Sequence, residues 1–98
     1  MIFAEMQYQN HYSEFHAELV EFIKSNFTNV ECGLQGDSWI WIFDENDKVA
    51  IDTFSSMKHQ VKCENPNSSL TNKVINALSN RYKLRIYSKP EREPHEDI

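Results

Sequence analysis

The chain has 98 residues, of which 40% are hydrophobic and 26% charged, and its net charge is −5. These values are typical of one globular domain with a single core, and the twelve aromatic residues favour a packed fold over a disordered chain. The acidic balance argues against direct binding of nucleic acid, which requires clustered Lys and Arg. No apolar run is long enough to span a membrane, and the first ten residues lack the pattern of a secretory signal, so we expect a cytoplasmic protein without a membrane partner.

The charge is distributed unevenly along the chain. Residues 1–57 carry ten acidic and two basic side chains, a net charge of −8, whereas residues 58–98 carry five acidic and eight basic ones, a net charge of +3. A small acidic domain of this kind, without a catalytic motif, is more often a binding protein than an enzyme. We therefore predict no enzymatic activity.

The N-terminal part predicts a strand followed by a helix. Residues 2–8 alternate between two faces, as in a half-buried strand. Residues 12–27 place apolar side chains at helical spacing, with Ser13 as the expected N-cap. The apolar stripe of this helix consists of Tyr12, Phe15, Leu19, Phe22, Ile23 and Phe27.

The middle of the chain predicts short strands joined by turns. The segment VECGLQ leads to a turn signal at Gly36-Asp37. Residues 38–43 form the next strand, in which both faces are apolar: one carries Trp39, Trp41 and Phe43, and the other carries Ile40 and Ile42. If both helices cover the same face of the sheet, either the Trp side chains or the Ile side chains must lie on the open face.

Two further strands follow the polar loop at residues 44–47. Residues 48–54 return antiparallel to the preceding strand. Residues 57–63 place Lys58, Gln60 and Lys62 on one face, which predicts a solvent-facing edge strand.

The C-terminal part predicts a second helix and a last strand. Ser68 or Ser69 caps the helix, whose buried stripe is Leu70, Val74, Ala77 and Leu78. Residues 82–87 form a strand with Leu84 and Ile86 directed inward. The expected fold is an α+β domain over residues 1–88, with a mostly antiparallel sheet of about five or six strands and two helices packed on one face. Residues 89–98 are expected to form a flexible charged tail.

Metal and cofactor sites are not expected. His11 and His16 are five residues apart, and His59 and Cys63 on one strand face lie about 13 Å apart, so neither pair suits one metal ion. The fourth histidine is His95. Two glycines are too few for a phosphate-binding loop. Cys32 and Cys63 are expected to be free thiols that pack as small apolar groups.

A partner-binding surface is the predicted functional feature. The Trp39 and Trp41 stripe supplies aromatic area of the kind found at binding hot spots, and acidic side chains near the strand turns can meet a basic partner. The candidate residues are Asp37, Trp39, Trp41, Asp44, Glu45, Asp47 and Asp52.

The segments GDSWIWIF and SMKHQVK look like a core of the kind that members of one family share. In size, acidity and α+β layout the chain resembles the small immunity proteins of polymorphic toxin systems, such as contact-dependent growth inhibition. This resemblance implies a non-catalytic inhibitor, a monomer or a homodimer, that neutralises a cognate basic toxin of nuclease type by blocking its active region. The acidic residues would then steer and grip the toxin, and Trp39 or Trp41 would anchor it.

Three alternatives stay open from the sequence. A self-associating structural or regulatory adaptor would use the open sheet face. A small enzyme would use Cys32, His59 and Asp52. A nucleic-acid binder would use the basic C-terminal residues, with Tyr82 and Tyr87 as stacking rings.

Overall fold

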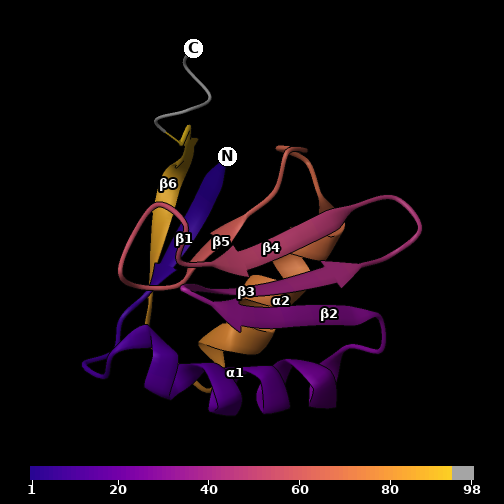
Figure 1. Cartoon of the computed structure of the whole chain (residues 1–98). Coiled ribbons are helices and arrows are strands. Elements are labelled where there is room, and N and C mark those ends of the chain that lie inside the picture. Colours follow the sequence, from indigo (N-terminus) through magenta and orange to yellow (C-terminus); the bar gives the residue numbers. More distant parts are fainter. Residues whose placement is uncertain (94–98) are drawn as a thin grey trace.

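The fold consists of one antiparallel sheet and two helices. The computed structural model describes residues 1–93. In chain order the elements are β1 (Ile2–Met6), α1 (Tyr12–Asn26), β2 (Val30–Gln35), β3 (Asp37–Phe43), β4 (Lys48–Asp52), β5 (Gln60–Lys62), α2 (Ser69–Ser79) and β6 (Leu84–Glu91) (Figure 1). The predicted α+β class, with a mostly antiparallel sheet of about five or six strands and two helices, is confirmed: residues 1–93 form six strands and two helices.

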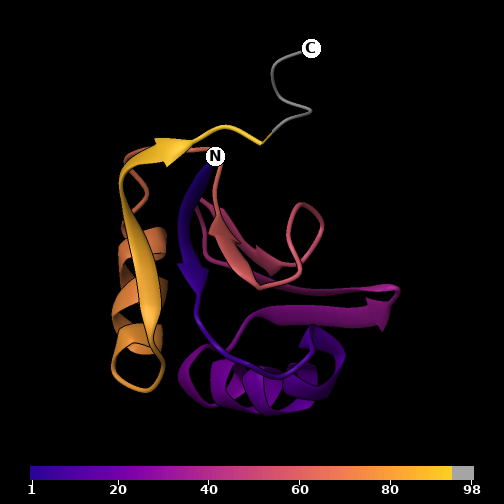
Figure 2. The same cartoon turned by 90° about the vertical axis from the view of Figure 1, so that its left-hand side faces the viewer.

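The strand order in the sheet is β2-β3-β4-β5-β1-β6. Strands β2 to β5 form a meander, because each strand pairs antiparallel with the next one along the chain. Short turns join β2 to β3 and β3 to β4, and a longer connection over residues 53–59 joins β4 to β5. The N-terminal strand β1 then inserts between β5 and β6. Figure 2 shows β1 and β6 side by side at one end of the molecule, so β2 and β6 are the two edges of the sheet.

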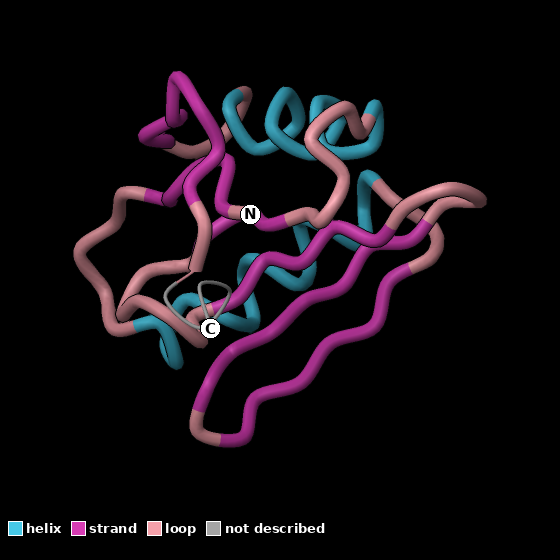
Figure 3. The backbone as a smooth tube through the Cα atoms, turned by 90° about the horizontal axis from the view of Figure 1, so that it is seen from above, coloured by secondary structure: helices cyan, strands magenta, loops and turns pink. Residues whose placement is uncertain are grey.

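Both helices pack on the same face of the sheet. Helix α1 packs on β2 and β3, whereas α2 packs on β4 and β5. Figure 3 shows the two helices on one side of the β2–β3 hairpin. The core lies between these layers and contains Leu19, Ile23, Ile40, Ile42, Val49, Ile51, Val61, Val74 and Leu78. The sheet therefore directs its Ile side chains inward and leaves the Trp face of β3 without a helix over it.

The helix caps follow local hydrogen bonding. His11, rather than the predicted Ser13, is the N-cap of α1: the Ser13 N–H donates to His11 Nδ1 at 3.2 Å. The His11 imidazole thus accepts the capping hydrogen bond that the sequence predicts for the Ser13 hydroxyl. At α2 the N-cap is Ser68, one of the two predicted residues, and its Oγ accepts from the Thr71 N–H at 3.1 Å.

The prediction of an edge strand over residues 57–63 is wrong. Strand β5 is short and lies between β4 and β1, and both Gln60 and Lys62 are buried. The Lys62 ammonium is buried because two carboxylates meet it there, as described below. Lys62 therefore does not lie on a solvent-exposed face of the sheet, although its position in the strand predicts one.

The C-terminal strand and tail also differ from the prediction. Strand β6 continues to Glu91, so residues 89–91 belong to the sheet rather than to a tail. Glu93 is buried and contacts Lys62. Ile86, predicted to point inward, is the register partner of the buried Ala4 but lies on the edge strand and is 57% exposed. The rest of the predicted tail, with His95, lies outside the described residues.

Candidate functional site

A row of aromatic side chains lies on the open face of β3. Ser38, Ile40 and Ile42 are buried toward the helices, and strand alternation directs Trp39, Trp41 and Phe43 to the other side. These three residues, here called the aromatic row, are only half-buried. The rings of Trp39 and Trp41 lie 4.5 Å apart between centroids with an interplanar angle of 40°. The structure therefore decides between the two faces that the sequence left open.

Gly33 on β2 makes room for one of these rings. It is the register partner of Trp39 across the β2–β3 pair. A Cβ at this position would lie 2.5 Å from Trp39 Cζ2, closer than atoms can approach. Any larger residue would thus push the indole away, so the glycine fixes where Trp39 sits. The sequence did not reveal this role of Gly33.

The ammonium group of Lys48 lies over the ring of Trp41. The Lys48 Nζ lies 4.4 Å from the Trp41 ring centroid, within range of a cation–π interaction. Lys48 comes from the start of β4, opposite Phe43. This contact shows that the ring face of Trp41 accepts a basic side chain in this environment.

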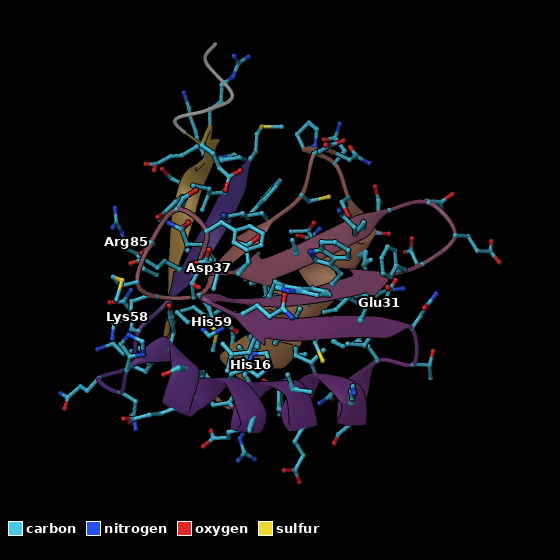
Figure 4. The ribbon with its side chains drawn as sticks, in the orientation of Figure 1. His16, Glu31, Asp37, Lys58, His59 and Arg85 are labelled. Atoms are coloured by element: carbon cyan, nitrogen blue, oxygen red, sulfur yellow. The ribbon has the colours of Figure 1, made fainter. Side chains whose placement is uncertain are left out.

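The predicted acidic residues do not form one cluster. Asp37 lies at the start of β3, and Asp44, Glu45 and Asp47 follow its end, so the two groups are about 20 Å apart along the strand. Glu31, which is not among the predicted residues, is exposed on β2 beside Trp41. Figure 4 shows Asp37 and Glu31 toward opposite ends of the hairpin. The aromatic row therefore has carboxylates at both ends.

The carboxylates of the loop at residues 44–47 differ in their hydrogen bonds. Asp44 Oδ1 accepts the backbone N–H groups of Asn46 and Asp47 at 2.8 and 2.7 Å, and these bonds lower the pKa of Asp44. Asp47 Oδ1 accepts from Asn65 at 3.2 Å. Both residues thus stabilise the turn. Glu45 is exposed and has no hydrogen-bond or ion-pair partner within residues 1–93, which leaves its carboxylate open to a partner.

Asp52 is buried and cannot contact a partner. Its side chain is buried on the open side of the sheet, where Oδ1 accepts from Lys62 Nζ at 2.5 Å and from the Phe54 N–H at 3.2 Å. Burial raises the pKa of Asp52, while the bond from Lys62 opposes the shift. Lys62 also forms an ion pair with Glu93. The prediction that Asp52 meets a partner is therefore replaced by an internal role.

A shallow groove separates the aromatic row from this ion cluster. Its volume is about 220 Å³, and its lining includes Trp41, Lys48, Ala50, Phe54 and Lys62. Phe54 is 54% exposed. The open face thus combines ring surfaces with charges of both signs, which suits a protein surface with protruding side chains.

A buried polar chain lies on the opposite, helix-covered face. Ser38 Oγ is 2.6 Å from His16 Nδ1 and 2.7 Å from His59 Nε2, and His59 Nδ1 is 2.7 Å from the Tyr8 hydroxyl. Burial lowers the pKa of His59 to about 4, and it raises the pKa of Tyr8 to about 12. Ser38 and His59 are fully buried, so a substrate cannot reach this hydroxyl. The chain joins α1 to the sheet.

The residues of the enzyme alternative are not brought together. Cys32 is the register partner of Ile40, so it faces the helices, and His59 does so as well. Asp52 is the register partner of Trp39 on the open face. These three groups therefore lie on two sides of the sheet and form no triad.

The cysteines and the metal-ligand residues are also dispersed. Cys32 on β2 and Cys63 beyond β5 are free thiols, about 14 Å apart across three strand spacings, which a disulfide cannot bridge. Within residues 1–93 no three His, Cys, Asp or Glu side chains gather in a way that could hold a metal ion. Neither of the helices described is long and apolar enough to cross a membrane.

No protein-family model matches this chain, and neither does any curated protein or solved structure. The open face, with its aromatic row and flanking carboxylates, is therefore the basis for a functional proposal.

Proposed function

We propose that this chain is a non-catalytic inhibitor of immunity-protein type, which binds a basic protein partner, such as a nuclease toxin, through the open face of its sheet. The observation that carries the proposal is the aromatic row, which no helix covers and which has carboxylates at both ends. Aromatic side chains in such a setting are the usual anchors of protein interfaces.

Charge supports a basic partner over an acidic one. Glu31, Glu45 and Asp37 surround the aromatic row, and Lys48 already shows how an ammonium group lies on Trp41. A partner lysine or arginine would find the same two attractions, a ring face and a nearby carboxylate. The net charge of −5 would also speed the encounter with a basic protein.

The test is a capture experiment with the tagged full chain in a lysate of the source organism, followed by mass spectrometry and titration of the purified partner. We expect a basic protein at one-to-one stoichiometry. The Trp41→Ala variant should bind it at least about tenfold more weakly, as for a hot-spot residue.

Met57→Ala is the matched control, because Met57 is a large apolar side chain, 63% exposed, that lies outside the aromatic row. Its affinity should stay within about twofold of that of the unmodified chain. A partner that is acidic, or one that binds Trp41→Ala as tightly as Met57→Ala, would refute the proposal.

A further inference from the structure

The two edges of the sheet differ in how well they are protected. Strand β6 has Arg85 and Lys89 on its edge, and Pro90 lacks an N–H. Its pairing with β1 is interrupted by a bulge, since Ala4 pairs with Ile86 but Ile2 pairs with Glu91. Basic side chains, proline and bulges are the devices by which proteins prevent pairing with another chain.

Strand β2 has none of these devices. All six of its residues are in regular register with β3, and it contains no proline, lysine or arginine. Within residues 1–93 β2 pairs with β3 alone, and none of its residues is buried. Its only charged side chain is that of Glu31.

The outward backbone groups of β2 follow from the register. The Phe43 N–H donates to the Asn29 carbonyl at 3.0 Å, so Asn29 directs its backbone toward β3. By alternation Glu31, Gly33 and Gln35 do the same, and Val30, Cys32 and Leu34 direct their N–H and C=O groups away from the sheet. Ser38 agrees with this pattern, because its carbonyl accepts from the Thr53 N–H on the β4 side.

We propose that β2 is a docking edge at which an extended segment of a basic protein adds as a further strand of the sheet. This inference rests on the proposed function and specifies how the partner is held. Main-chain bonds to Val30, Cys32 and Leu34 supply the attachment, as in other cases of strand addition. The charge of the strand selects a basic segment over an acidic one.

The side chains on the open face also restrict which residues the added strand can carry. An incoming residue opposite Gly33 lies beside the Trp39 ring, which covers that glycine, and is therefore apolar. The residue two positions along lies opposite Glu31 and carries an ammonium or guanidinium group. For an antiparallel strand the apolar residue comes first in the sequence of the partner and the basic residue follows.

The test uses a displayed library of random eight-residue peptides selected on the full chain. Selected peptides should show this alternation with Lys or Arg at the Glu31 position. They should bind Leu34→Pro at least about tenfold more weakly, because this variant lacks one outward N–H while every bond to β3 is kept. Leu34→Ala is the matched control: it loses the same side chain, keeps the N–H, and should bind within about twofold of the unmodified chain.

Hydrogen exchange provides the second measurement. With the unmodified chain, a bound peptide should slow exchange of the Cys32 and Leu34 amides by at least about tenfold. Failure to select basic alternating peptides, equal affinity for the Pro and Ala variants, or protection at β6 instead would overturn the proposal. A chain that dimerises through β2, and is monomeric as Leu34→Pro, would overturn it in favour of a second copy as the occupant. Loss of capture by Trp41→Ala with unchanged capture by Leu34→Pro would leave the proposed function intact and reject the docking edge alone.

Discussion

At the scale of single residues, the open face is shaped by a few side chains whose roles depend on their neighbours. Lys62 looks like a solvent-facing residue in the sequence, yet it is buried between Asp52 and Glu93. The charge of the nearby Glu93 carboxylate adds to the effect of burial in raising the pKa of Asp52, while the bond from Lys62 opposes the shift. Removal of this lysine would take away the buried cation that both carboxylates contact.

The most direct prediction at this scale concerns Gly33. The Gly33→Ala variant places a methyl group inside the Trp39 indole, so the ring must move outward. We expect a free energy of unfolding lower by about 1 to 3 kcal/mol and a shift of the tryptophan emission to longer wavelength. Urea denaturation followed by fluorescence measures both. Gln35→Ala, on the same face of β2, should change neither, and an unshifted spectrum for Gly33→Ala would contradict the placement of Trp39 on this glycine.

At the scale of elements, the polar chain of Tyr8, His59, Ser38 and His16 connects α1 to β3 and to the segment before β5. Each neutral imidazole has one donor and one acceptor nitrogen, so the contacts can run in one direction along the chain. If both imidazoles were protonated, two N–H donors would meet Ser38 Oγ and leave its own hydroxyl proton without an acceptor. The chain therefore favours neutral histidines.

This arrangement predicts that acid destabilises the fold. The folded pKa of His59 is about 4, below the ordinary value near 6.5, so the unfolded state binds more protons between these two pH values. The free energy of unfolding should therefore fall as the pH drops from about 6.5 to 4, by about 3 kcal/mol from this residue. Stability that depends on neutral His59 is fully present above this window.

The measurement is urea denaturation of the unmodified chain and of His59→Gln across the same pH range. His59→Gln should be less stable at pH 7, because it loses the bonds to Ser38 and Tyr8. Its free energy of unfolding should also fall less than that of the unmodified chain as the pH drops. The two plots of unfolding free energy against pH should therefore converge at low pH. Parallel curves would mean that His59 does not titrate in this window.

At the scale of the whole molecule, the charge asymmetry of the sequence becomes an asymmetry across the sheet. The acidic first part supplies β1, α1, β2, β3 and β4, and the basic second part supplies β5, α2 and β6. Strand β1 of the first part pairs with β6, but the two edges still differ: β2 carries Glu31 and no basic residue, whereas β6 carries Arg85, Lys89 and Glu91. A basic partner would thus approach the β2 side and be repelled from the β6 side.

Charge reversal tests this polarity. The double variant Glu31→Lys and Glu45→Lys should slow association with the captured basic partner by about tenfold at low salt, and the difference should shrink at high salt. Lys89→Glu at the far edge is the control and should leave the rate unchanged or raise it slightly. A double variant that associates at the unmodified rate would show that steering does not act from this side.

Much of the architecture is determined by the sequence alone. Helical spacing marks α1 and α2, alternation marks β1 and β3, and the polar turns set the meander, because each of these signals depends only on near neighbours along the chain. The α+β class and the position of both helices on one face follow from them.

The tertiary structure decided the features that depend on residues far apart in the sequence. It placed β1 beside β5 and brought Asp52 and Glu93 around Lys62. It also turned the Trp side chains rather than the Ile side chains to the open face. It also brought Gly33 under Trp39 and joined His16, Ser38, His59 and Tyr8. The physical reason is that strand order and burial of charge are set by pairings between segments far apart in the sequence, such as Ile2 of β1 with Glu91 of β6, on which local periodicity carries no information.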